Sequence, residues 1–318
     1  MIMMDRRTLG NSDISIAPLI FGGNVFGWTV DEPGAFALLD AFVASGFNCI
    51  DTADSYSTWV PGHTGGESET IIGNWMRLRG NRDKVVIATK VGSEMGPGKK
   101  GLSKSRILDA VEDSLRRLQT RYIDLYQTHR DDPGTPVDET LEAYALLVKE
   151  GKVRAIGASN LTPARLSESL AAAEDKGYPR YQTMQPHYNL YERAGYEKEL
   201  EGLCRSKNVA VIPYFPLAAG FLTGKYRSVN DLSKSARGAG LRKYLNERGF
   251  RILAALDTVG ERLNASQAVV ALAWLLARPG ITAPIVSATS RAQWEDIARA
   301  PDVILDGPSV ELLDSASR

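Results

Sequence analysis

Four polar residues, Asp51, Tyr56, Lys90 and His129, are of types that could carry out acid–base chemistry together. Asp51 and Lys90 lie 39 residues apart, and His129 follows Lys90 by another 39. A lysine at the end of a buried strand is costly unless it is paired, and Asp51 is its natural partner. A tyrosine beside this lysine is expected to have a lowered pKa, because a nearby cation favours the phenolate. Such a tyrosine could protonate a carbonyl oxygen, to which a neutral His129 could also hydrogen-bond.

The elements that position these residues alternate between short apolar segments and longer segments of helical period. Eight segments are predicted as strands: 19–21, 47–50, 85–89, 122–127, 153–157, 181–184, 209–213 and 281–286. Helical patterns lie between them, for example at 35–44, 67–79, 105–118, 140–148, 163–173 and 197–205. This alternation indicates a parallel sheet, and eight units favour a (β/α)8 TIM barrel over a doubly wound sheet.

The repeat of 39 residues is close to the length of one strand–helix unit of a barrel, about 30 to 50 residues. Asp51, Lys90 and His129 are therefore expected at the C-terminal ends of three successive strands, on the face where barrel enzymes carry out catalysis. Residues 5–17 suggest a β-hairpin at the bottom of the barrel. Residues 218–249 are predicted to form one long loop, and residues 1–318 one domain.

The composition excludes several classes of protein. The 318 residues carry 38 Lys+Arg and 38 Asp+Glu, so no basic field favours nucleic acid. The N-terminal sequence is no signal peptide, and the longest apolar run, Val269–Ala277, is too short to span a membrane. Two cysteines give no disulfide framework, and the three histidines have no metal-ligand spacing. We expect a cytoplasmic protein without a metal and without nucleic-acid or membrane partners; the sequence does not predict its oligomeric state.

Several segments resemble, in order along nearly the whole chain, motifs of the aldo-keto reductase family of bacterial type. They are 51–56 (DTADSY) with 66–69 (GESE), 89–92 (TKVG), 126–129 (YQTH), 157–160 (GASN), 185–190 (QPHYNL), 213–217 (PYFPL) and 220–226 (GFLTGKY). The resemblance implies an NADPH-dependent carbonyl reductase, with NADH also possible. In this interpretation Tyr56 is the general acid, Lys90 held by Asp51 lowers its pKa, and His129 polarises the carbonyl of a small-molecule substrate.

The same resemblance implies a site for the cofactor. Ser159, Asn160 and Gln185 would bind the nicotinamide carboxamide, and Tyr214 would stack on the ring. Gly22 and Gly23 would bring the backbone close to the cofactor, and the pyrophosphate would lie against the segment that holds Pro216, Leu217 and Gly220. Lys225 begins a basic segment, with Arg227, Lys234 and Arg237, that could close over the pyrophosphate. The adenosine phosphate would meet Ser287, Thr289, Ser290, Arg291 and Gln293, where this chain has a serine and a glutamine in place of the lysine and arginine that many members use.

Candidate substrate contacts come from the loops: Phe26, Trp28, Trp59, Arg130 and Arg242. Aromatic walls with a few polar groups suit small or sugar-derived aldehydes. Two other functions remain open. The chain could be a non-catalytic, cofactor-binding regulatory subunit of the same fold, or a barrel lyase that forms a Schiff base on Lys90. The second needs an unprotonated lysine, which the Asp51 partner disfavours.

Overall fold

The computed structural model describes residues 5–318, so residues 1–4, on which part of the signal-peptide prediction depends, lie outside it. Eight strands form one sheet in which all neighbours are parallel. They are β3 (Ile20–Gly22), β4 (Cys49–Asp51), β5 (Val86–Val91), β6 (Ile123–Thr128), β7 (Val153–Ser159), β8 (Tyr181–Gln185), β9 (Ala210–Val211) and β10 (Ile285–Val286). Each overlaps one of the predicted strands.

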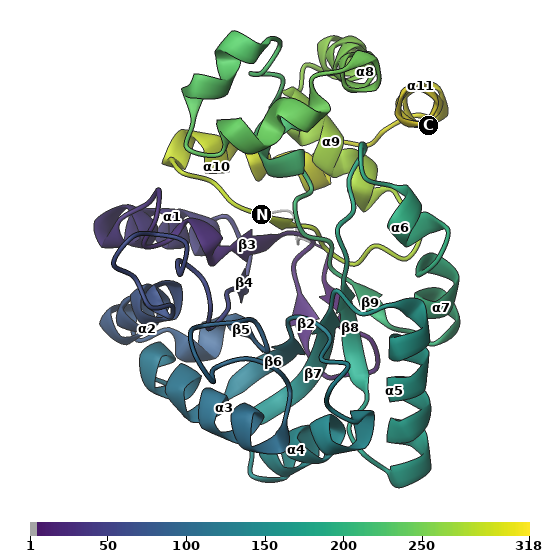
Figure 1. The fold of residues 1–318 in the computed structure, drawn as a ribbon. Helices are drawn as coiled ribbons and strands as arrows, with labels where there is room; N and C mark the ends of the chain where they lie inside the picture. Colours follow the sequence, from purple (N-terminus) through teal and green to yellow (C-terminus); the bar gives the residue numbers. More distant parts are fainter. Residues whose placement is uncertain (1–4) are drawn as a thin grey trace.

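The sheet closes on itself. Its order is β10-β3-β4-β5-β6-β7-β8-β9, so the last strand of the chain lies beside the first. Backbone hydrogen bonds from Thr282 N to Val211 O (2.8 Å) and from Ile285 N to Pro213 O (2.9 Å) join the segment of β10 to that of β9. The (β/α)8 barrel is thereby confirmed, and the doubly wound alternative is wrong (Figure 1).

Helices surround the barrel (Figure 1). The main ones are α1 (Glu32–Ala44), α2 (Glu67–Arg79), α3 (Lys104–Leu118), α4 (Val137–Lys149), α5 (Pro163–Lys176), α9 (Gln267–Leu276) and α10 (Arg291–Ile297). Several begin at a side chain that accepts a backbone N–H, as at Asp31, Ser103 and Thr162. The predicted helix 197–205 is instead two short helices, α6 (Ala194–Glu197) and α7 (Glu201–Ser206). A bond from Leu200 N to Tyr196 O keeps a helical turn between them, which explains the apolar period.

Two further helices, α8 (Glu247–Leu263) and α11 (Gly307–Ser317), pack against each other beside α9. The segment before α8 was predicted as one loop, but it contains three short 3-10 helices: η3 (Ala218–Thr223), η4 (Val229–Lys234) and η5 (Gly238–Tyr244). Phe221, Leu241 and Tyr244 are buried and anchor it to the rest of the protein. These few anchors are spread through a polar sequence, so no apolar period revealed them. The remaining 3-10 turns are η1 (Gly23–Val25), η2 (Arg82–Lys84) and η6 (Ala300–Asp302).

The predicted hairpin is confirmed as β1 (Arg7–Thr8) paired antiparallel with β2 (Ser15–Ile16). Leu9, Ile14 and Ile16 are buried in one apolar cluster with inward-facing strand residues such as Val86 and Leu125. The backbone N–H of Ala17 donates to Asn48 Oδ1 (2.9 Å), just before β4 begins. The hairpin therefore covers the N-terminal end of the barrel.

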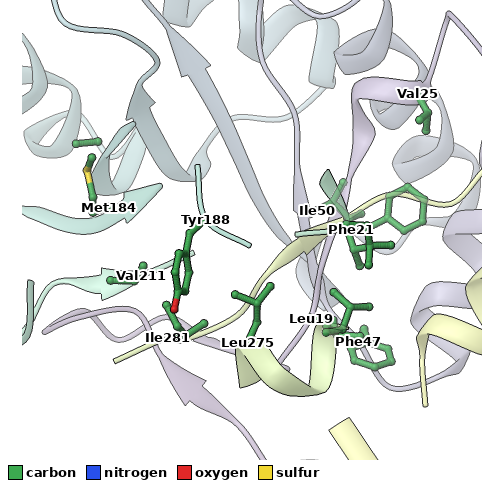
Figure 2. Packing of buried hydrophobic residues seen from close by; sticks show 14 of the residues in the cluster. Leu19, Phe21, Val25, Phe47, Ile50, Met184, Tyr188, Val211, Leu275 and Ile281 are labelled. Carbon is green, nitrogen blue, oxygen red and sulfur yellow. The ribbon is translucent and has the colours of Figure 1, made fainter. Parts of the chain in front are cut away.

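The larger apolar core lies between the outer face of the sheet and the helices. Figure 2 shows part of it, where Leu19, Phe21, Phe47 and Ile50 gather near Leu275. The side chains inside the barrel change from apolar to polar along its axis. Its N-terminal part is apolar, whereas Asp51, Lys90, Gln127 and Gln185 are buried near the C-terminal ends of the strands.

Candidate active site

The register of the sheet explains how Asp51 and Lys90, which are 39 residues apart in the sequence, come to lie on the same face of neighbouring strands. Asp51 pairs with Ala88 on β5, and Lys90 pairs with Gln127 on β6. Each 39-residue step is thus displaced by two residues from the direct neighbour, as tilted barrel strands require. Because two residues return a strand to the same face, Asp51 and Lys90 both point into the barrel. His129 directly follows β6 at the barrel's C-terminal mouth.

Lys90 and Asp51 form a buried ion pair. Their side chains are 0% and 1% exposed, and Lys90 Nζ lies 2.5 Å from Asp51 Oδ2. The ammonium also donates to Thr52 O (2.7 Å) and to the hydroxyl of Tyr56 (2.9 Å). Burial by itself lowers the pKa of Lys90, but the charges of Asp51 and Tyr56 outweigh it and raise that pKa above its usual value. Lys90 is therefore a cation, which argues against the Schiff-base lyase.

Tyr56 is half-buried and lines the cavity described below. The hydroxyl accepts from Lys90 Nζ and donates to Asp51 Oδ2 (3.4 Å). Burial raises the pKa of Tyr56 to about 12, and the nearby Lys90 only partly opposes this. The expected lowering of this pKa is therefore wrong for the protein without a cofactor, because loss of water around the phenolate outweighs the cation. Tyr56 is protonated throughout the neutral range.

His129 faces Tyr56 across the mouth of the barrel. Their ring centroids are 6.0 Å apart, and His129 Nδ1 lies 3.5 Å from Ser55 Oγ. Burial, together with the charges of Lys90 and Arg130, holds the pKa of His129 well below its usual range. The imidazole is therefore neutral, as a hydrogen-bonding partner of a carbonyl oxygen requires.

A cavity of about 860 Å³ opens over these groups. Of the residues predicted for catalysis and substrate, it is lined by Asp51, Tyr56, His129, Trp59 and Arg130. Of those predicted for the cofactor, it is lined by Gly22, Ser159, Asn160, Gln185, Tyr214, Pro216, Leu217, Gly220, Lys225, Ser287, Thr289 and Gln293. One hollow thus runs from the Lys90–Tyr56 pair to the start of α10.

The residues predicted to hold the nicotinamide are bonded to one another. Ser159 Oγ donates to the backbone oxygen of Gln185 (2.9 Å), and Asn160 Nδ2 donates to Ser159 Oγ (3.0 Å) and to His129 O (3.0 Å). The Tyr214 hydroxyl donates to Asn160 Oδ1 (2.9 Å). These contacts hold the five polar groups as one wall of the cavity before any ligand binds.

Left-handed backbone is concentrated around the cavity. Within residues 5–318, eight non-glycine residues have positive φ, and five of them lie in segments that border the cavity: Ser57, Asn160, Phe215, Ala218 and Ala219. Such conformations are costly for residues with a side chain, and they are typical of ligand sites. Sequence reasoning missed Phe215 and Ala219, which line the cavity, because nothing in the residue types signals the strain.

The residues near β10 that were predicted to bind the cofactor hydrogen-bond to the segment after β3 and to one another. Ser287 Oγ donates to Gly22 O and Asn24 Oδ1 (both 2.7 Å). A Cβ at Gly22 would lie only 2.6 Å from Ser287 Oγ. Thr289 donates through its backbone and its hydroxyl to Gln293 Oε1 (2.9 and 3.0 Å). These contacts hold the start of α10 close to β3.

Some predicted residues lie outside the lining. Arg291 is 74% exposed and paired with Glu295 (2.7 Å), and Ser290 caps α10 by accepting from Gln293 N. Gly23 is buried, with its carbonyl oxygen accepting from Ser68. These three residues therefore do not line the cavity. Arg291 turns outward because its carboxylate partner lies one turn along the same helix.

The substrate predictions divide in the same way. Trp59 lines the cavity, is 47% exposed and packs edge-on against Tyr56 (6.1 Å) and Trp28 (5.8 Å). Trp28 supports Trp59 from outside the lining. Phe26 is fully buried and stacks on Phe21, so it belongs to the core, and Arg242 is exposed on η5 away from the cavity. Both expected substrate contacts are corrected: Phe26 is packed in the core, and Arg242 is exposed to solvent.

Gln127 was not among the residues predicted for the site, and Arg237 was predicted only as part of the basic segment that could close over the pyrophosphate. Gln127 is inaccessible to solvent, and its Nε2 donates to Asp51 Oδ1 (3.0 Å). Its place two residues before His129, at an inward position of the strand, was a signal that could have identified it. Arg237 lines the cavity from the segment before η5, with its guanidinium over the Trp28 ring at 5.1 Å. No sequence period distinguishes Arg237 from the other cations of that segment.

Comparison with known sequences identifies the family to which this barrel belongs. The sequence model of the Aldo/keto reductase family matches residues 18–318, so the chain belongs to that family. It is 36% identical to "Uncharacterized oxidoreductase YrpG" of Bacillus subtilis, over 98% of this chain and 95% of that protein. It is 32% identical to "Protein tas" of Escherichia coli, over 91% of each chain.

A third relative carries a different kind of name. "Probable voltage-gated potassium channel subunit beta" of Oryza sativa is 32% identical over 95% of this chain and 92% of that protein. The family and the oxidoreductase-named relatives identify the chain as an aldo-keto oxidoreductase. Among residues 5–318 there is no helix long and apolar enough to cross a membrane.

Proposed function

We propose that the chain reduces aldehydes or ketones, sugar-derived ones included, to alcohols with NADPH, and that Tyr56 donates the proton. The observation that carries this proposal is the position of the Tyr56 hydroxyl. Tyr56 lines the cavity, and its hydroxyl accepts a hydrogen bond from the buried, charge-balanced Lys90, with a neutral His129 opposite. A proton donor and a neutral hydrogen-bond donor that converge on one point suit a carbonyl oxygen.

The residues of the cavity fit a dinucleotide. Its volume is within the range of small-molecule and cofactor sites. Three cations, Arg130, Lys225 and Arg237, line it without an ion-pair partner among residues 5–318. Arg237 Nη2 is buried and has no hydrogen-bond partner within the same residues. A buried cationic donor left unsatisfied is costly, so an anion such as a pyrophosphate is expected to complete it.

The proposed preference for NADPH over NADH depends on the residues near the start of α10. The residues near the start of α10 that face the cavity, Thr289 and Gln293, are neutral, and Asp296 also lines it. Arg291, the cation nearest to them in sequence, is held by Glu295. Neutral donors can hydrogen-bond a 2′-phosphate, but they discriminate less than a cation does. We therefore expect only a small preference for NADPH, with NADH also used.

The bound nicotinamide supplies the hydride for the reaction. Tyr56 gives its proton to the carbonyl oxygen, and Lys90 stabilises the phenolate that remains. Asp51 keeps Lys90 charged, and neutral His129 donates a hydrogen bond that orients the carbonyl. Trp59, packed edge-on against Tyr56 and Trp28, borders these groups at the cavity.

A non-catalytic, cofactor-binding regulatory subunit is the second candidate, and the rice relative named as a channel subunit favours it. The intact set Asp51, Tyr56, Lys90 and His129 weighs against it, because a subunit that only binds nucleotide has no need of a buried proton donor. Turnover separates the two candidates.

The test is a titration of the purified protein with NADPH and NADH, followed by tryptophan fluorescence. Short, aromatic and sugar aldehydes are then added while the nicotinamide absorbance is monitored. Tight NADPH binding with turnover supports the reductase. Binding without turnover on every carbonyl favours the regulatory subunit, and no binding of either nucleotide refutes both.

A matched pair of arginine variants tests the nucleotide site. Arg237→Met is expected to weaken NADPH binding, since it removes the unpartnered guanidinium from the cavity. Arg227→Met is the control, because Arg227 lies in the same basic segment but is paired with Asp257 (2.8 Å) and does not line this cavity. Equal effects of the two substitutions would contradict the assignment.

A further inference from the structure

Two buried glutamines complete the hydrogen bonding of Asp51. The Nε2 atoms of Gln127 and Gln185 lie 3.0 and 3.1 Å from Asp51 Oδ1. Gln185 Nε2 also donates to Gln127 Oε1 (3.1 Å). Asp51 Oδ2, by contrast, faces Lys90 and Tyr56. The two carboxylate oxygens are thus divided between a charged partner and a pair of neutral amides.

We infer that Gln127 is a positioning residue that links the proton-donating group to the nucleotide site. It holds Asp51 Oδ1, so that Oδ2 faces Lys90, and it fixes the amide of Gln185 through its own oxygen. Gln185 lines the cavity and uses its nitrogen for both bonds, so its oxygen remains for the carboxamide nitrogen of a nicotinamide. This inference rests on the proposed function and adds a residue that does not itself touch the reacting atoms.

The amide is suited to this position because it is a neutral donor. Lys90 and Asp51 balance each other's charge in a site that excludes water. An acid at position 127 would repel Asp51, and a base would compete with Lys90 for it. A neutral amide satisfies the second carboxylate oxygen without disturbing that balance.

The surroundings of Gln127 also restrict it. Gly157 on the neighbouring strand has no side chain, and a Cβ there would lie 3.1 Å from Gln127 Cγ and 2.2 Å from Thr183 Oγ1. Thr183 is a second buried polar residue inside the barrel, but its hydroxyl has no hydrogen-bond partner in residues 5–318. It provides a matched control, since Thr183→Val removes a buried hydroxyl without touching Asp51.

The test compares Gln127→Met with Thr183→Val and the wild type. Binding of NADPH and of adenosine 2′,5′-bisphosphate, which lacks the nicotinamide, is measured by tryptophan fluorescence and competition. Gln127→Met is expected to weaken NADPH binding about tenfold, equivalent to one lost hydrogen bond, and to leave the bisphosphate unchanged. Thr183→Val should change neither. Equal weakening of both ligands by Gln127→Met would show a merely structural role and overturn the inference.

A second variant gives a readout that packing alone would not move. In Gln127→Glu the introduced carboxyl group can donate to Asp51 only while it is protonated. Hydride transfer, measured in a single turnover, should therefore recover relative to wild type as the pH falls from 8 to 6. A pH profile parallel to that of the wild type would overturn the inference. If Gln127→Met does not fold, the Gln127→Glu variant alone tests the inference. Failure of the wild type to bind NADPH would refute the proposed function instead, so the two failures are distinguishable.

Discussion

Replacing Asp51 by asparagine should destabilise the fold far more than the same change at an exposed ion pair. Lys90 and Asp51 are almost inaccessible to water and lie 2.5 Å apart. Asparagine keeps the shape and an oxygen for Gln127 and Gln185, so the principal loss is the charge. Breaking a buried pair from one side leaves an uncompensated buried charge and costs about 3–5 kcal/mol of unfolding free energy.

The control is Asp138→Asn. Asp138 pairs with Lys176 at 2.6 Å, but the two side chains are 49% and 42% exposed, and such a pair contributes no more than about 1 kcal/mol. Urea unfolding of both variants at pH 7 gives the comparison. The double variant Asp51→Asn/Lys90→Met should recover most of the loss, because it removes the stranded ammonium as well. Equal losses for Asp51→Asn and Asp138→Asn would refute this reasoning about the ion pair.

Three further results are expected. Burial and the charge of Glu69 raise the pKa of Asp54 to about 7, so the stability that this protonated acid contributes is lost as the pH rises from about 4 to 7. Asp54→Asn should remove up to about 3 kcal/mol of pH dependence in urea unfolding between pH 5 and 9, all of it below about pH 7. Because burial raises the pKa of Tyr56 to about 12, the rate of carbonyl reduction should not fall between pH 7 and 10, and a decline within that range would contradict this raised pKa. Trp59→Ala should raise the KM of aromatic aldehydes several-fold with little change for short ones, since its exposed ring borders Tyr56.

The sequence was sufficient to predict the order of strands and helices and the meeting of Asp51 with Lys90. Strand-to-helix alternation follows from local residue patterns, and the equal spacing of three polar residues reflects the repeat of the barrel unit. The contact of Gln127 and Gln185 with Asp51 could not be predicted in the same way. It depends on which residues pair across the strands, and here β6 is offset by two residues from the 39-residue repeat.

The errors have physical causes as well. The pKa of Tyr56 depends on how much water reaches its hydroxyl, which residue type does not reveal. Phe26 and Trp59 both follow a predicted strand and have similar side chains, yet one is fully buried and the other borders the cavity. Arg242 and Arg237 lie five residues apart on one basic segment, and only the turns of η5 decide which faces the cavity.

The central claim is that Tyr56 donates the proton, and Tyr56→Phe tests it most directly. Single-turnover oxidation of bound NADPH by the best aldehyde is measured for the variant and the wild type, with NADPH affinity determined in parallel. The account predicts that affinity is retained while the rate falls by about 10²–10⁴-fold, the usual contribution of a positioned general acid. A variant that binds NADPH and transfers hydride at a rate close to that of the wild type would contradict it.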